Sequence, residues 1–326
     1  TWGAYGGKIV SGQGTARAVV DWEGTGTKKL WVQEQSITVD TVCYGVSDTL
    51  FVAVFKDPTT IAMDFVTISI EEGTQSRLQW QVDGNLSAAG TISLQRRVAG
   101  SSGWAESASV PSSVRSQTDS GLQGREETYE YRLVALNGCG EEIASDTHQT
   151  ILLQGETDAR QEALTLNWNA YSGWQEGVLR YQVWRRVDSE IEYSLLQEVD
   201  DSKLSLAGLS TAAGFIHSYR VKAIASGTPW ESWSNSIEFS FEHALSIPNI
   251  FSPNGDGLND TFFIPKLELY SDNELVVVNR LGQEVYRKKG YQGNWNGGNV
   301  VSGVYYYSLY VGRLGKYFKG WVEIVR

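Results

Sequence analysis

"YRLVA" at residues 131–135 and "YRVKA" at residues 219–223 are two copies of one short segment. Both are rich in the residue types that favour β-strands. An offset of 88 residues relates the two copies, and the same offset relates LQW at residues 78–80 to LNW at residues 166–168. Because two separate motifs keep one offset, the sequence predicts a duplicated β domain.

Each copy also contains a middle strand, ISLQRRV at residues 92–98 and YQVWRRV at residues 181–187. A Trp strand, a middle strand and a Tyr strand in this order resemble the fibronectin type III fold, which keeps its Trp in the core. The resemblance implies that Tyr129 occupies the corner position, with its hydroxyl bonded back to the main chain, and that His217 replaces it in the second copy. The fibronectin type III-like domains are expected at residues 58–155 and 156–244.

The composition supports a chain of several small β domains. Its 326 residues suit two to four domains of about 100 residues each. Hydrophobic residues make up 41% of the chain, with 12 Trp and 16 Tyr against one Met, and the Val- and Thr-bearing runs rarely reach helical length. We therefore expect an all-β chain of tandem immunoglobulin-like or fibronectin-like β-sandwiches.

Charge and hydropathy argue against two classes of function. The net charge is -11 and the pI is near 4.9, whereas binding to nucleic acid needs clustered Lys and Arg. No window holds 18 apolar residues, so the sequence predicts no transmembrane segment. Because the chain begins at Thr1 without Met or a signal-like stretch, we interpret it as a mature or C-terminal portion of a longer protein.

The first stretch of the chain consists of short β runs separated by Gly and Thr turns. KIVSGQGTARAVVDW at residues 8–22 is followed by TKKLWVQEQ at residues 27–35 and DTLFVAVF at residues 48–55. This pattern of residues resembles the PKD-like repeats of large bacterial surface proteins. We expect a PKD-like β-sandwich at residues 1–57 that is partial, with its N-terminal strands missing.

No set of residues in the sequence matches a catalytic site. The three His stand in unrelated contexts, and a hydrolase needs a base held beside a nucleophile. We expect a structural role for His217 in a strand, and we expect His148 and His243 at the surface. Carboxylate pairs such as Glu71-Glu72 fall in expected loops rather than across an apolar cleft. The sequence therefore predicts a protein that is not an enzyme.

Two cysteines, Cys43 and Cys139, are too few for a disulfide framework and too far apart for a zinc motif. Two interpretations stay open for them. A single bridge could join them in an oxidising compartment. Alternatively, both are buried free thiols, because free Cys packs as a small apolar residue.

Tryptophans in expected loops suggest an alternative function. Trp174, Trp230 and Trp233 lie where strand alternation would not bury them. Exposed Trp can stack on sugar rings or anchor a protein interface. The alternative hypothesis is therefore a carbohydrate-binding surface module that uses these three side chains. The competing interpretation is that they fold back over the edge of a sandwich.

The loop NIFSPNGDGLNDTF at residues 249–262 places oxygen-bearing side chains at alternate positions. Asn254, Asp256 and Asp260, with the carbonyl of Leu258, supply half of the ligands that a calcium loop requires. No cofactor is certain on this pattern, and calcium is a candidate. The competing interpretation is a pair of Asx turns, in which side-chain oxygens accept main-chain N–H groups.

The last 80 residues resemble a known family as a whole pattern. IPNIFSPNGDGLNDTFFI is followed by LVVVNRLGQEVYRKKGYQGNWNGG, SGVYYYSLYV and KGWVEIVR. In this order they look like the gliding-motility-associated C-terminal domain, the type B sorting domain of proteins exported by the type IX secretion system of Bacteroidota. The resemblance covers residues 245–326 and implies a β-sandwich sorting domain.

The resemblance also implies partners and a location. The expected partners are the type IX secretion translocon, an outer-membrane barrel of the PorP/SprF type and other surface proteins. The expected location is extracellular, at the cell surface and associated with the outer membrane. The preceding domains then suit a stalk for adhesion or gliding motility. The residues expected to dock to the translocon are Asn254, Asp256, Asn279, Arg280, Gly282, Trp295, Tyr305, Tyr306, Tyr307 and Arg326.

Overall fold

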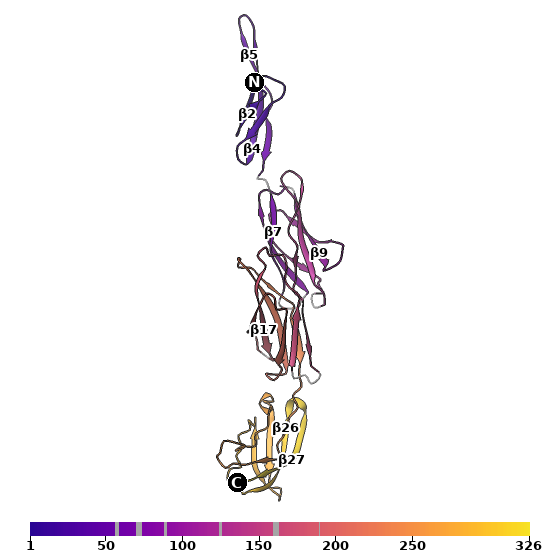
Figure 1. Cartoon of the computed structure of the whole chain (residues 1–326), viewed down its shortest axis with the longest axis vertical. Helices are drawn as coiled ribbons and strands as arrows, with labels where there is room; N and C mark the ends of the chain where they lie inside the picture. Colours follow the sequence, from indigo (N-terminus) through magenta and orange to yellow (C-terminus); the bar gives the residue numbers. More distant parts are fainter. Residues whose placement is uncertain (56–58, 70–73, 88–89, 124–125, 159–162, 189) are drawn as a thin grey trace.

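The computed structural model describes residues 1–55, 59–69, 74–87, 90–123, 126–158, 163–188 and 190–326. Within these ranges the chain forms β-strands in several sheets, with two short 3₁₀ helices and no α-helix. The sheets follow one another along a narrow rod whose two ends hold the N-terminal and C-terminal units (Figure 1). The predicted all-β fold class is confirmed.

The first unit, residues 1–55, has strands but no closed core. Strand β4 pairs with β1, β5 and β6, and β2 and β3 form a separate hairpin. None of residues 1–55 has a buried side chain, so this unit lacks the filled interior of the expected β-sandwich. Its strands are β1 (Trp2–Tyr5), β2 (Gly7–Ser11), β3 (Val19–Trp22), β4 (Gly26–Ile37), β5 (Val42–Val46) and β6 (Leu50–Val54).

The second unit is a β-sandwich with two antiparallel sheets, which we call the first bead. One sheet has the order β11-β8-β7, and the other has the order β10-β9-β12-β13, with β14 also paired to β12. The strands are β7 (Thr60–Ile68), β8 (Gln75–Asp83), β9 (Thr91–Val98), β10 (Ala105–Pro111), β11 (Ser116–Ser120), β12 (Tyr129–Leu136), β13 (Glu142–Ala144) and β14 (His148–Gln149).

The third unit, the second bead, repeats this arrangement with sheets β15-β16-β19 and β18-β17-β20-β21, and β22 also pairs with β20. Strand β15 pairs with β16, so the boundary expected at residues 155/156 is wrong; the sheets divide between residues 149 and 153. The strands are β15 (Leu153–Thr157), β16 (Ala163–Trp168), β17 (Val178–Val187), β18 (Ser194–Asp200), β19 (Ser205–Ser210), β20 (Ile216–Ala225), β21 (Glu231–Trp233) and β22 (Ile237–Ser240).

The duplicated motifs form equivalent parts of the two cores. Trp80 and Trp168 are buried, and the side chains of Tyr131 and Tyr219 have no exposed surface. The hydroxyl of Tyr129 accepts a hydrogen bond from the main-chain N–H of Gln123, with 3.0 Å between nitrogen and oxygen. This is the corner bond that the fibronectin resemblance implied for Tyr129.

The C-terminal unit is a single five-stranded sheet with the order β23-β27-β26-β24-β25. Strand β23 runs parallel to β27, and the other pairs are antiparallel. The expected hairpin across Arg280–Gln283 joins β24 to β25, with Gly282 at φ 80°. The elements are β23 (Ile250–Phe251), η1 (Leu267–Leu269), β24 (Asn273–Val278), β25 (Glu284–Lys289), β26 (Gly303–Val311), η2 (Gly312–Leu314) and β27 (Lys316–Ile324).

Irregular segments cover one face of this sheet where a sandwich would have a second sheet. Phe262, Ile264 and Leu267 between β23 and β24, and Tyr291 and Trp295 between β25 and β26, are buried in one core with the inward side chains of the strands. The opposite face of the sheet, which we call the uncovered face, presents the exposed side chains of Val304, Tyr306, Tyr317 and Trp321.

The first bead contains a buried polar network whose loss should be measurable. The Tyr131 hydroxyl donates to Asp119 (2.7 Å) and accepts from the Ser76 hydroxyl (2.8 Å), and Arg96 pairs with the same Asp119 carboxylate (2.6 Å). Tyr131→Phe leaves buried polar atoms without a partner, so it should destabilise the bead by about 1–3 kcal/mol.

Hydrogen exchange of the β8 and β12 amides during urea titration of the full chain would measure this loss. The matched control is Tyr219→Phe in the second bead, where the hydroxyl contacts the His217 imidazole (3.1 Å) and no carboxylate. Equal destabilisation of the two beads would show that the Asp119 network contributes nothing specific.

Candidate functional site

The first bead has a strand edge that is covered by the second bead. Strand β7 pairs with β8 on one side, and its other edge forms hydrogen bonds with strand β21 and with the segment between β16 and β17 of the next domain. The N–H of Val66 donates to the Tyr171 hydroxyl (3.1 Å), and the carbonyl of Val66 accepts from the Ser232 hydroxyl (2.7 Å). An unpaired strand edge is a site for non-native pairing, and here the neighbouring bead occupies it.

Two further bonds complete this contact, which we call the bead joint. The Trp174 indole N–H donates to the carbonyl of Asp64 (2.7 Å), and the main-chain N–H of Trp233 donates to the Thr67 hydroxyl (2.7 Å). Four direct bonds between residues more than 100 positions apart fix the two beads to each other. Figure 1 shows the beads in direct contact along the rod.

The three tryptophans proposed for sugar contact lie in or beside this joint. Trp174 packs on the Tyr171 ring, with 4.0 Å between ring centroids, and Trp230 packs on Phe65 at 5.9 Å. Trp233 lies against the Arg220 guanidinium at 4.6 Å. All three side chains are half-buried. Each of the three rings thus packs against a protein group, which favours the competing interpretation that they fold back over the edge of a sandwich.

All three histidines are buried, which corrects the expectation that His148 and His243 lie at the surface. His148 is 1% exposed, and its Nδ1 lies 2.8 Å from the Tyr171 hydroxyl. Burial lowers the pKa of His148 to about 4, because the charged imidazolium loses its hydration. The Tyr171 hydroxyl, which accepts from the Val66 N–H, can donate its hydrogen bond to Nδ1 of the neutral ring, so a chain of hydrogen bonds links Val66, Tyr171 and His148.

The candidate calcium loop is closed by its own main chain. Asp260 accepts from the N–H groups of Gly255 (2.7 Å) and Gly257 (2.9 Å). Asp256 accepts from the N–H of Leu258 (2.7 Å), and Asn254 accepts from the N–H of Asp256 (3.0 Å). This is the Asx-turn arrangement that the sequence left open.

The same hydrogen bonds occupy oxygens that a bound cation would need as ligands. The Leu258 N–H and the Asn254 amide lower the pKa of Asp256. Its carboxylate and that of Asp260 already hold N–H donors, and a hard cation needs six to eight oxygens directed at one point. Among the described residues, no group of three or more His, Cys, Asp and Glu could hold a metal ion. These bonds favour the Asx-turn interpretation over the calcium interpretation.

The expected docking residues divide between core and surface. Trp295 and Tyr305 are 4% and 6% exposed and form part of the C-terminal core, so their expected contact with a partner is corrected. Tyr307 is half-buried against Phe262. Strand parity explains these positions: Tyr305 and Tyr307 share the inward side of β26 with Leu309 and Val311. The surface members are Asn254, Asp256, Tyr306, Arg280, Gly282 and Arg326, with half-buried Asn279 at the same hairpin turn.

Two of these surface members have structural partners of their own. Asn279 accepts from the N–H of Leu281 (2.9 Å) and so closes the β24–β25 turn. Arg326 donates to the carbonyls of Val300 and Gly298, the latter at 2.9 Å. Arg326 therefore fixes the chain end against the segment before β26. The side chain of Arg280, by contrast, is exposed in the turn between β24 and β25.

The uncovered face of the C-terminal sheet carries an aromatic stripe, of which the sequence analysis named Tyr306 but not Trp321 or Tyr317. Tyr306 pairs across the strands with Trp321, and Tyr310 pairs with Tyr317. Tyr306, Trp321 and Tyr317 are 50%, 46% and 65% exposed. The rings of Tyr310 and Tyr317 lie 4.8 Å apart. Successive side chains of a strand point to opposite faces of the sheet, so the apolar residues Val322 and Ile324 on the inner face could have predicted that Trp321 points outward.

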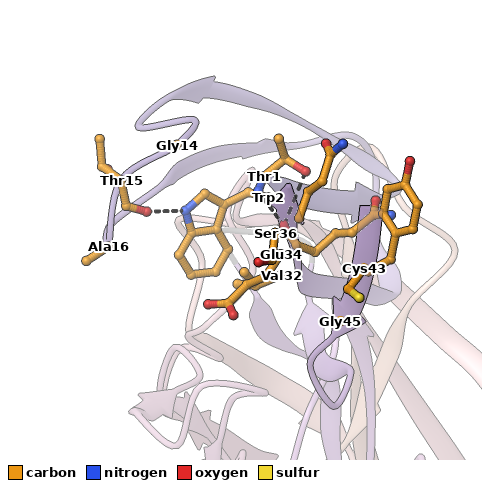
Figure 2. A pocket seen from close by; sticks show the side chains of 13 residues that line it. Thr1, Trp2, Gly14, Thr15, Ala16, Val32, Glu34, Ser36, Cys43 and Gly45 are labelled. Atoms are coloured by element: carbon orange, nitrogen blue, oxygen red, sulfur yellow. Dashed lines mark hydrogen bonds between the residues drawn. The ribbon is translucent and has the colours of Figure 1, made fainter. Parts of the chain in front are cut away.

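The cysteines are free and exposed, so neither interpretation of them holds. Cys43 lies on β5 in the N-terminal unit and Cys139 in the turn between β12 and β13 of the first bead. Cys43 lines an open groove of about 800 Å³ beside β1 and β4. In this groove the Trp2 indole donates to the Thr15 carbonyl (2.9 Å; Figure 2).

The chain is a multidomain all-β protein, because it joins two β-sandwiches of one topology to a C-terminal unit that is built on a single sheet. Residues 245–324 match the family model described as CHU_C Type IX secretion signal domain. The sorting domain expected from the sequence is thereby confirmed, and the C-terminal region carries a signal for export to the cell surface or beyond. In the described part of the chain, no helix is both long and apolar enough to cross a membrane.

Comparison with solved structures gives remote likenesses. Pectate lyase Pel3 from Pectobacterium carotovorum is 20% identical over 32% of this chain and 31% of that chain, with a TM-score of 0.24. The chain thus spans about a third of the length of that lyase chain. The FN1-FN3 domains of chicken CNTN1 are 14% identical over 69% of this chain and 81% of that chain, also with a TM-score of 0.24. Neither likeness carries an argument at that TM-score, and no curated protein matches.

Acid should weaken the bead joint through His148. Its pKa is lower in the folded chain than the usual value near 6.5, so the stabilisation is complete above pH 6.5 and is lost as the pH falls toward 4. The difference between the folded and the usual pKa of His148 corresponds to about 3 kcal/mol in the free energy of unfolding.

Hydrogen exchange of the Val66 amide in the full chain, corrected for the intrinsic effect of pH, would report the change between pH 7 and pH 4.5. His148→Gln, which does not titrate, serves as the control and should show a flat profile over this range. A wild-type profile as flat as that of the variant would refute the role of His148.

Removing the Asp260 carboxylate should open the 254–260 loop. Asp260→Ala deletes the acceptor of two N–H groups, so exchange at Gly255 and Gly257 should rise by about tenfold or more, the equivalent of ~1.4 kcal/mol. Asp260→Asn keeps one oxygen acceptor and should show a smaller rise. Calcium chloride added to the wild type should slow neither amide; a clear slowing would restore the calcium interpretation.

Proposed function

We propose that this chain is a non-catalytic stalk of a bacterial cell-surface protein, exported by the type IX secretion system of Bacteroidota and serving adhesion or gliding motility. The observation that carries the proposal is the match of residues 245–324 to a type IX secretion signal domain. The stalk role draws its support from the bead joint, because two fixed domains hold their ends at a constant separation as a spacer must.

The distribution of charge supports a division of labour between the stalk and the sorting domain. Residues 1–244 hold 18 Lys and Arg against 31 Asp and Glu, whereas residues 245–326 hold nine against seven. An acidic stalk repels other copies of itself and stays solvated. The nearly neutral sorting domain, by contrast, can approach a partner surface without a large electrostatic barrier.

The uncovered face of the C-terminal sheet is the surface that we assign to docking with the translocon and with an outer-membrane barrel of the PorP/SprF type. Tyr306 and Trp321 offer large, amphipathic rings of the kind that dominate binding energy at interfaces. Arg280 stands at the tip of the β24–β25 turn and adds a free cation. The surface sits at the far end of the rod from the N-terminal unit (Figure 1).

Export of the full chain tests this function. The chain, placed behind a signal peptide and a fluorescent reporter, is expressed in a type IX-competent bacterium and in a translocon mutant of the same strain. We expect surface or medium localisation in the first strain and periplasmic retention in the second. Equal localisation in both strains would overturn the proposal.

Variants of the same fusion test the docking surface. Tyr306→Ala combined with Trp321→Ala should lower the surface fraction by about tenfold, since exposed aromatic anchors each contribute 1 kcal/mol or more at an interface. Tyr5→Ala, which removes a side chain of similar exposure from the N-terminal unit, should leave the fraction unchanged. Unimpaired export of the double variant would move the docking surface elsewhere on the domain.

A further inference from the structure

Phe215 belongs by sequence to the second bead but by packing to the sorting domain. It lies in the turn between β19 and β20, and its side chain is 6% exposed. Its contacts place it in the same hydrophobic core as Phe262, Leu275 and Leu309 of the C-terminal sheet. The core of the sorting domain therefore includes a side chain that lies 30 residues before the matched segment begins.

Three groups enclose the Phe215 ring. The Tyr270 ring meets it edge-on, with 5.0 Å between centroids, and the His243 ring lies at 5.4 Å. On its face lies the guanidinium of Arg313, at 3.8 Å from the ring centroid. Tyr270 and Arg313 belong to the sorting domain and His243 to the connection between the two domains, so Phe215 contacts both.

Hydrogen bonds tie the connection to both sides. The Tyr270 hydroxyl donates to the carbonyl of His243 (2.5 Å), and the His243 Nε2 bonds to the carbonyl of Gly214 (2.8 Å). A continuous path of bonded groups thus runs from the sorting domain through His243 to the turn that carries Phe215. A linker that only tethered the domains would not need these buried polar pairings.

The turn itself is held in a fixed shape by the second bead. The Asp188 carboxylate accepts from the N–H groups of Phe215 (2.8 Å) and Ile216 (2.9 Å). Asp188 adopts φ 50°, a left-handed conformation that is costly for a residue other than Gly. A Cβ on Gly214 would lie 2.4 Å from an Asp188 carboxylate oxygen. The second bead thus fixes in advance the turn that directs Phe215 toward the sorting domain.

We propose that the second bead and the sorting domain are coupled through Phe215, a side chain of the bead that completes the core of the sorting domain. The export determinant then extends beyond residues 245–324 to the turn that carries Phe215 and is held by Asp188. Correct placement of this turn becomes a condition for full folding of the signal. The structural half of this inference is independent of the proposed function, whereas its consequence for export rests on that function.

Hydrogen exchange on the full chain tests the structural half. Phe215→Ala should speed exchange of the Leu275, Leu309 and Val322 amides by about tenfold, since these residues share its core. The matched control is Phe239→Ala, which removes the same atoms from a half-buried ring that packs on Tyr219 within the second bead. That control should speed exchange in β20 and leave the three amides unchanged.

A variant on the other side of the contact guards against simple misfolding of the second bead. Arg313→Ala removes the cation above the ring from the sorting domain, and coupling between two sites is reciprocal. It should therefore speed exchange at the Ile216 amide, which belongs to the bead. Unchanged exchange at Ile216 in Arg313→Ala, or at the three sorting-domain amides in Phe215→Ala, would overturn the inference.

Measurement of export distinguishes a failure of this inference from a failure of the proposed function. In the type IX-competent strain, Phe215→Ala should lower the surface fraction by at least about fivefold, and Phe239→Ala should not. If wild type is retained in the periplasm, the proposed function fails while the exchange results still decide the structural coupling. If wild type is exported and Phe215→Ala is exported equally well, the proposed function stands and the extended export determinant is rejected.

Discussion

The free edge of β7 is the constraint on which the arrangement of the two beads depends. A fibronectin-like sandwich leaves edge strands with unpaired N–H and carbonyl groups, and those groups must find water or a partner. At Val66 the partner is the next bead, through Tyr171 and Ser232. Because these are bonds to the main chain, they depend on the position of β7 and not on the identity of its side chains. Three of the four bonds of the bead joint thus reach main-chain groups of β7, whereas the fourth uses the Thr67 hydroxyl.

The two connections along the rod differ in what the second bead contributes to its neighbour. At the bead joint, strand β21 and the segment between β16 and β17 of the second bead cover a strand edge of the first. At the next connection, a turn of the second bead fills the core of a domain that has one sheet and irregular cover. Domains linked this closely transmit orientation along the chain, whereas the N-terminal unit, in which no residue of 1–55 is buried, has no comparable interior. The stiff part of the rod therefore lies toward the sorting domain.

Local patterns predicted most of the fold, and long-range contacts account for what they missed. The offset between Trp80 and Trp168 identified the duplication, and strand parity would have placed Tyr305 correctly in the core. The burial of His148 depends on Tyr171, which approaches it from another domain. Likewise the Trp174 indole bonds to Asp64 of the first bead, and Phe215 packs against Tyr270 of the sorting domain, so a sequence window around either residue does not contain these partners. The cysteines were judged by type, although exposure depends on the strand or turn that carries each one.

Divergence between the two beads has a consequence for how the chain reaches this fold. Neighbouring domains of one topology can exchange strands while folding, which produces misassembled chains. The repeat offset places Leu164 of the second bead where the first has Ser76, a partner of the Tyr131 hydroxyl. A strand carrying Tyr131 inserted into the wrong bead would bury a hydroxyl without Asp119, its acceptor, and would leave Asp119 with Arg96 but without the Tyr131 donor. The unlike polar interiors thus carry an energetic penalty against exchange of these strands between the two sandwiches.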